Sequence, residues 1–277
     1  MKIIDIDSLF DKYISDYVYK NVGKVAPDEI ENKIAELYLD FGKKNLSELD
    51  GKSPEEYYLQ FSCKELLTGL KTHLSEGVAV PDFLCEAIII KKDESDVVIN
   101  ELSSSDDEEY LMYLMNILKS VDSDRLAKIY FEILLCDYSD AIKELATELL
   151  SDGMSNQVSA EIIKEYENAD QTTKERFCEI LAGASKTDEI FQILINEFNA
   201  RQDNIPLFAG YLAKYGDDRA IVTLTTAIEK EKIKYADFEE LRFAIESLGG
   251  EYNKQRDFSH DKFFNKIKGK QGDNQLS

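Results

Sequence analysis

The feature of this sequence that most constrains its fold is a polar pair that recurs at intervals of 28 to 32 residues. The pairs are Ser95-Asp96, Ser123-Asp124, Ser155-Asn156, Thr187-Asp188 and Asp217-Asp218. Apolar residues follow the second member of each pair at offsets of two and six residues, and in four copies also at ten. Because steps of four residues keep side chains on one helix face, each copy is predicted to begin with an amphipathic helix. The second polar residue is predicted to be its N-cap.

Each copy then contains a second stretch with helical apolar spacing, such as Leu111, Leu114 and Leu118 in the first. Two helices in about 30 residues cannot bury both apolar faces unless each pair stacks on the next. The chain has only 4 Pro and 13 Gly in 277 residues, which suits long helices with short connections. The predicted fold is therefore all-α, an α-solenoid of antiparallel helix pairs.

The last copy resembles a known repeat family. Residues 212–221 read LAKYGDDRAI, and residues 243–249 read FAIESLG. This is similar to the short HEAT-like repeat of the phycobilisome-lyase type, with its Gly-Asp-x-Arg-Ala turn and a helix that ends in Ala-x-x-Leu-Gly. The resemblance covers roughly residues 93–250. It implies a curved solenoid whose second helices line the inner surface and bind another protein; it does not imply lyase activity, because no chromophore-handling motif is present.

Helical regions are predicted on both sides of the repeats. Residues 1–92 are expected to pack on the solenoid, with one helix over 8–21 and another that opens at Pro27. Ser53 and Glu56 have the spacing of a capping box. Residues 251–277 are predicted to form a capping helix and a flexible tail.

Charge and composition argue against several classes of function. The chain has 33 Lys+Arg and 55 Asp+Glu, a net charge of −22, which disfavours binding to nucleic acid. No apolar stretch approaches the roughly 18 to 20 residues that cross a membrane, and acidic residues interrupt the N-terminus where a secretory signal would be apolar. The four cysteines have irregular spacing, which predicts buried free thiols in a reducing cytoplasm.

No catalytic residue, cofactor site or metal site is predicted. Residues 51–53 read GKS, but Leu46 stands where a phosphate-binding loop needs Gly. His73 is expected to be a partly buried histidine near a helix end, and His260 is expected to lie in a frayed segment. The acidic run 106–109 could chelate a cation, but carboxylates are also favoured in the first turn of a helix, and that interpretation is preferred.

The expected function is protein binding, as a scaffold or adaptor. Residues 93–170 contain 20 acidic and 5 basic residues, so a basic protein is one predicted partner. Alternatives are an enzyme or enzyme subunit on a helical scaffold, lyase-like or DNA-acting, and a small-ligand binder with a pocket between the N-terminal helices and the first repeat. Helical phase predicts a partner-binding surface on the second helices, made of Glu109, Tyr113, Asn116, Lys143, Glu144, Thr147, Lys174, Arg176, Tyr211, Lys214, Glu239 and Arg242.

Overall fold

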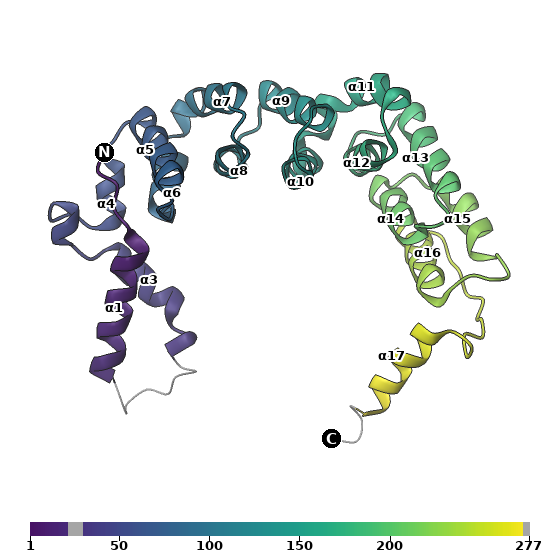
Figure 1. Ribbon diagram of the computed structural model, residues 1–277. Helices are drawn as coiled ribbons and strands as arrows, with labels where there is room; N and C mark the ends of the chain where they lie inside the picture. Colours follow the sequence, from purple (N-terminus) through teal and green to yellow (C-terminus); the bar gives the residue numbers. More distant parts are fainter. Residues whose placement is uncertain (22–29, 274–277) are drawn as a thin grey trace. The chain divides into compact units, whose positions relative to one another are not determined.

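The structure, a computed structural model, describes residues 1–21 and 30–273 and contains only helices and connecting segments in those ranges (Figure 1). The predicted all-α class is confirmed. The chain divides into two compact units, one of residues 1–121 and 138–145 and one of residues 122–137 and 146–277. Helix α10 (Asp140–Leu149) carries the chain across this division.

The first unit consists of the N-terminal helices and the first repeat. Its elements are α1 (Ile6–Asn21), α3 (Ile34–Gly42), η1 (Ser47–Leu49), α4 (Pro54–Leu59), α5 (Cys63–Glu76), α6 (Asp82–Ile90), η2 (Lys92–Glu94), α7 (Ser95–Ser104) and α8 (Glu108–Ile117). The helix predicted over 8–21 is confirmed as α1. The predicted helix start at Pro27 lies outside the described residues.

The predicted capping box starts α4. The Ser53 hydroxyl accepts a hydrogen bond from the Glu56 N–H at 3.3 Å, and Glu56 Oε2 accepts one from the Ser53 N–H at 3.4 Å. Ser62 and Glu65 repeat this arrangement at the start of α5. Two backbone donors of each helix that have no intrahelical partner are thereby satisfied.

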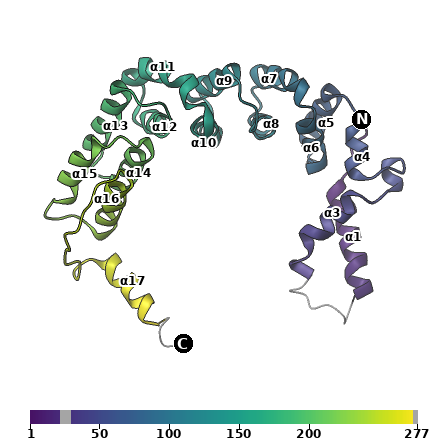
Figure 2. The ribbon, with the colours of Figure 1, turned by 180° about the vertical axis from the view of Figure 1, so that it is seen from behind.

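The second unit contains the remaining repeats in two layers. Its elements are α9 (Asp124–Leu135), the π-helical turn η3 (Leu150–Met154), α11 (Ser155–Glu165), η4 (Tyr166–Asn168), α12 (Gln171–Leu181), α13 (Asp188–Ala200), α14 (Ile205–Tyr215), α15 (Ala220–Ile228), α16 (Tyr235–Ser247) and α17 (Lys262–Asp273). The first helices α11, α13 and α15 lie on one side, and the second helices α12, α14 and α16 on the other, as Figures 1 and 2 show. None of the helices in the described ranges has the length and apolar character that a membrane span requires.

The repeated apolar positions form the core of every helix pair. At offsets two and six, no side chain is more than 3% exposed: Val98, Leu126, Val158, Ile190 and Ala220, then Leu102, Tyr130, Ile162, Leu194 and Leu224. The predicted buried helix face is confirmed in all five copies.

The prediction that the second polar residue of each pair is the N-cap is wrong in all five copies. Asp188 is the first residue of α13, and the preceding Thr187 is the N-cap, with its hydroxyl accepting from the Ile190 N–H at 3.2 Å. Two of the pairs instead join consecutive repeats: Asn156 Oδ1 accepts from the Ser185 N–H at 2.7 Å, and Asp188 Oδ1 accepts from Arg219 Nη1 at 2.6 Å. The reason is geometric. A short polar side chain at the start of the first helix of one repeat reaches the turn that precedes the first helix of the following repeat.

The segment between α16 and α17 is held against the second unit. The Tyr252 hydroxyl donates to Glu229 Oε1 at 2.9 Å, and the Phe258 ring lies 5.0 Å from that of Phe238. Asp261 Oδ2 accepts from the Tyr235 N–H at 3.1 Å. The prediction of a frayed segment around His260 is therefore wrong for residues up to Asp261. The end of the predicted flexible tail, residues 274–277, lies outside the described residues.

Candidate functional site

The residues predicted to bind a partner all lie on second helices. They come from α8, α10, α12, α14 and α16. Glu109, Asn116, Glu144 and Lys214 are exposed, and Tyr113, Lys143, Lys174, Arg176, Glu239 and Arg242 are half-buried.

Thr147 and Tyr211 correct this prediction, because both are buried. The Tyr211 ring packs edge to face on Phe208 at 5.6 Å, and its hydroxyl donates to Glu179 Oε2 at 3.4 Å. Tyr211 therefore joins α14 to α12. Thr147 lies in the last turns of α10, where its carbonyl accepts from the Ser151 hydroxyl at 2.5 Å. The spacing of apolar residues within one helix predicted that both positions are exposed. That spacing does not show where α10 and α14 pack against other helices.

The α16 part of the surface centres on an apolar residue that the sequence pattern did not single out. Phe243 is 65% exposed and lines a shallow depression together with the side chains of its own helix. Arg242 Nη2 lies 2.5 Å from Glu239 Oε2, and its Nε lies 3.9 Å from Glu246 Oε1. An exposed aromatic ring is thus surrounded by charged groups that already pair with each other.

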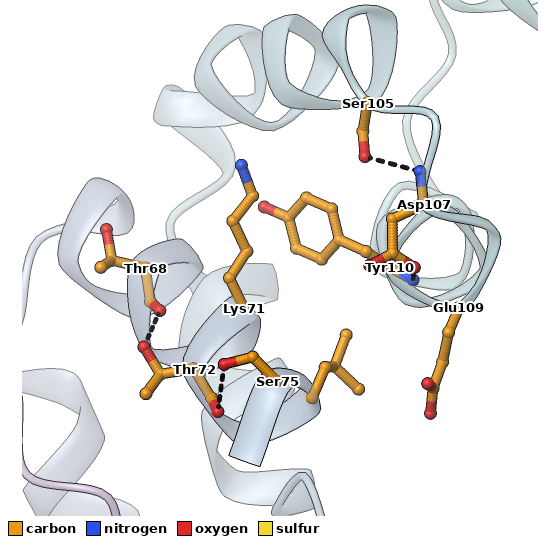
Figure 3. Close-up of a pocket in the computed structure, with 9 residues that line it drawn as sticks. Thr68, Lys71, Thr72, Ser75, Ser105, Asp107, Glu109 and Tyr110 are labelled. Atoms are coloured by element: carbon orange, nitrogen blue, oxygen red, sulfur yellow. Dashed lines mark hydrogen bonds between the residues drawn. The ribbon is translucent and has the colours of Figure 1, made fainter. Parts of the chain in front are cut away.

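A deeper hollow lies in the first unit, between the last turns of α5 and the start of α8 (Figure 3). Its volume is about 400 Å³. Its lining residues are Thr68, Lys71, Thr72, Leu74 and Ser75 from α5, Ser105 and Asp107 from the turn after α7, and Glu109 and Tyr110 from α8. It therefore lies between an N-terminal helix and the first repeat, where the small-ligand alternative placed a pocket.

Local sequence explains why these side chains face the hollow. The polar residues of α5 recur at three- and four-residue spacing, whereas Leu66, Leu67 and Leu70 are buried on its other face. At the other wall, Asp107 is the N-cap of α8 and its Oδ1 accepts from the Tyr110 N–H at 3.2 Å. The acidic run 106–109 thus begins a helix, as predicted.

The positive charge at the hollow is already compensated. Lys71 Nζ lies 2.6 Å from Glu101 Oε2 and 4.8 Å from the centre of the Tyr110 ring. Tyr110 is only 1% exposed, and its hydroxyl has no hydrogen-bond partner among the described residues. Burial, and then the negative charge of Glu101, raises the pKa of Tyr110, so its hydroxyl stays protonated at neutral pH.

The hydroxyl groups of α5 present acceptors to the hollow. Thr68 donates to the Lys64 carbonyl, Thr72 to the Thr68 carbonyl and Ser75 to the Thr72 carbonyl, at 2.8, 2.8 and 3.1 Å. A hydroxyl has one donor and two acceptor lone pairs. With the donors directed to the helix backbone, the lone pairs remain for a ligand.

Within the described ranges, no group of three or more His, Cys, Asp and Glu side chains is placed to hold a metal ion. His73 is fully buried, and its Nδ1 lies 2.9 Å from the Ala79 carbonyl oxygen. Cys63 and Cys178 are buried free thiols as predicted, but Cys85 is only half-buried, and Cys136 is exposed because it follows the last turn of α9.

No family model, curated protein or solved structure matches this chain. The resemblance to HEAT-like repeats therefore stays a prediction, and the site is interpreted from its own residues.

Sequence reasoning missed most of the hollow's lining. Thr68, Lys71 and Thr72 lie more than 30 residues from Asp107 and Glu109, and no motif connects the two groups. The available signals were a polar stripe on α5 and the acidic run, and each has an ordinary structural explanation by itself. Only the packing of α5 beside α8 brings them to one place.

Proposed function

We propose that this chain is a non-enzymatic protein-binding repeat protein, a scaffold or adaptor that binds its partner on the exposed face of the second helices. One observation carries the proposal: Phe243 is 65% exposed at the centre of a charged rim on α16. Aromatic side chains surrounded by polar groups are the usual energetic centres of protein interfaces. The resemblance of residues 93–250 to HEAT-like repeats supports the same function.

A cytoplasmic location is part of this proposal. Cys136 is an exposed free thiol, and Cys63, Cys85 and Cys178 are free as well. Free thiols persist in reducing compartments.

Affinity capture with a matched pair of variants tests the proposal. Phe243→Ala removes the exposed ring from the second helix α16, whereas Val222→Ala removes an apolar group that is 74% exposed on the first helix α15. We expect Phe243→Ala to reduce partner capture at least tenfold and Val222→Ala to leave it unchanged, with both variants melting as the wild type does. Equal capture by all three proteins would contradict the proposed surface.

A small-ligand function is favoured by a different observation, the hollow between α5 and α8. Its size falls in the range of about 300 to 1,000 Å³ that is typical of ligand pockets.

A further inference from the structure

We propose that the hollow between α5 and α8 binds the positively charged end of an arginine or lysine side chain that a partner protein supplies. The inference rests on the proposed protein-binding function and names the chemistry of one contact. It adds a site, on the first unit, to the surface that Phe243 marks on the second.

Hydrogen-bonding capacity is the first support. Thr68, Thr72 and Ser75 line the hollow and direct their donors to backbone carbonyls, so their oxygens keep lone pairs as acceptors; Figure 3 shows the bonds that join the three residues. Asp107 uses Oδ1 for the helix cap. A lining rich in acceptors matches a group rich in donors, and a guanidinium has five N–H donors and an ammonium three.

Charge is the second support. Lys71 is neutralised by Glu101 at 2.6 Å, so the net charge of the lining comes from Asp107 and Glu109. Glu108 is engaged elsewhere, because its Oε1 accepts from the Ser139 N–H at 2.8 Å, and the hydrogen bonds from the Ser139 side chain and then from its N–H lower the pKa of Glu108. Glu109 is exposed and has no ion pair with any described residue. The Glu109 carboxylate therefore remains available to a cationic group in the hollow.

Tyr110 is the third and independent support. It is 1% exposed, it lines the hollow, and its hydroxyl has no partner among the described residues. Figure 3 shows this hydroxyl directed across the hollow toward Lys71. The Lys71 ammonium already lies 4.8 Å from the centre of the Tyr110 ring, so this wall of the hollow accommodates a cation beside an aromatic face.

The volume of the hollow limits the size of its occupant. A volume of about 400 Å³ admits one long side chain and its neighbouring atoms, but not a folded segment. Leu74 gives the aliphatic stem of an arginine or lysine an apolar contact while the charged end meets the carboxylates.

A short tryptophan peptide provides a direct test, because the chain itself has no Trp. The probe is acetyl-Gly-Arg-Trp-Arg-Gly-amide, and its neutral match carries citrulline in place of both arginines. Binding is followed by tryptophan fluorescence anisotropy at low and high NaCl. We expect the arginine peptide to bind with an affinity that falls with salt, and the citrulline peptide to bind at least tenfold more weakly.

Variants assign this binding to the hollow. Asp107→Asn with Glu109→Gln removes both charges, and Asn keeps the cap of α8. We expect about tenfold weaker binding of the arginine peptide, from two contacts of surface strength. Glu231→Gln, which removes an exposed acid in the second unit, should have no effect. Equal binding by the double variant and the wild type would overturn the proposal.

Two further measurements separate the alternatives. The first is competition with spermidine. If spermidine displaces the peptide and binds the hollow more tightly than the peptide does, a free polyamine is the occupant and the proposal is wrong. Phe243→Ala should bind the peptide as the wild type does. If the double variant retains both peptide and partner while Phe243→Ala loses the partner, the hollow proposal fails and the proposed protein-binding function stands.

Discussion

Two kinds of tyrosine hydroxyl occur in the helix pairs. The Tyr130 ring is fully buried in α9, and its hydroxyl has no partner among the described residues. The Tyr215 hydroxyl, in contrast, accepts from the Thr187 N–H at 2.7 Å and donates to the Thr187 carbonyl at 3.0 Å. The hydroxyl of Tyr130 is therefore expected to destabilise the fold, whereas that of Tyr215 joins α14 to α13.

This difference predicts opposite effects of the same substitution. Tyr130→Phe should leave the free energy of unfolding unchanged or raise it by up to about 1 kcal/mol, because a buried unpaired hydroxyl is removed. Tyr215→Phe should lower it by about 1 to 3 kcal/mol, because the Thr187 N–H loses its partner, whereas the Thr187 carbonyl keeps the bond from the Phe191 N–H. Urea denaturation of the two variants measures both values. A loss at Tyr130 as large as that at Tyr215 would show that the Tyr130 hydroxyl has a partner.

At the scale of helices, Arg219 fixes one repeat joint. Its guanidinium bonds to Asp188 at the start of α13 at 2.6 Å and to Asp217 at 2.7 Å, and it lies 4.2 Å from the centre of the Phe191 ring. Asp217 is only 8% exposed. A nearly buried carboxylate depends on such a partner.

Arg219→Ala should lower the free energy of unfolding, because Asp188 and the nearly buried Asp217 lose their cationic partner. The matched control is Arg242→Ala, whose partners Glu239 and Glu246 lie on the same exposed helix face; its cost should be about 0.5 kcal/mol or less. Equal losses in thermal or urea unfolding would mean that the joint contributes no more than a surface ion pair.

Stability at acid pH follows from the same joint. The hydrogen bonds from Arg219 hold the pKa of Asp217 below its ordinary value of 3.8. Because the folded value is below the unfolded value, this stabilisation is complete above about pH 4 to 5 and is lost as the pH falls through the folded value. The free energy of unfolding of Asp217→Asn should be lower at pH 7 and fall less steeply below pH 4 than that of the wild type. Parallel curves would contradict this linkage.

Sequence periodicity predicted the helices and their buried faces because helix burial follows local spacing. It wrongly predicted that the polar pairs cap their own helices, because the hydrogen-bond partners of Asn156 and Asp188 lie 29 and 31 residues further along the chain. Tyr211 was placed on the surface for the same reason, because its Glu179 contact crosses to another helix. Only the location of the hollow was predicted, as one alternative. Its lining residues come from separate helices, and the sequence does not show how these helices pack together.

For the whole molecule, the net charge of −22 opposes the compact state through repulsion between carboxylates. Raising NaCl from 50 to 500 mM shortens the Debye length from about 14 Å to about 4 Å and screens this repulsion. The melting temperature should therefore rise by several degrees. A falling melting temperature would show that attractive ion pairs such as Arg219 with Asp188 outweigh the repulsion.

Hydrogen–deuterium exchange of the whole chain, with and without a captured partner, tests most directly whether the second helices bind the partner. We expect slowed exchange on binding to be concentrated in second helices, including α16 around Phe243, and at the start of α8 beside the hollow. The first helices α11, α13 and α15 should exchange as they do in the free protein. Protection confined to those first helices, with α8 and α16 unchanged, would contradict the proposed binding face.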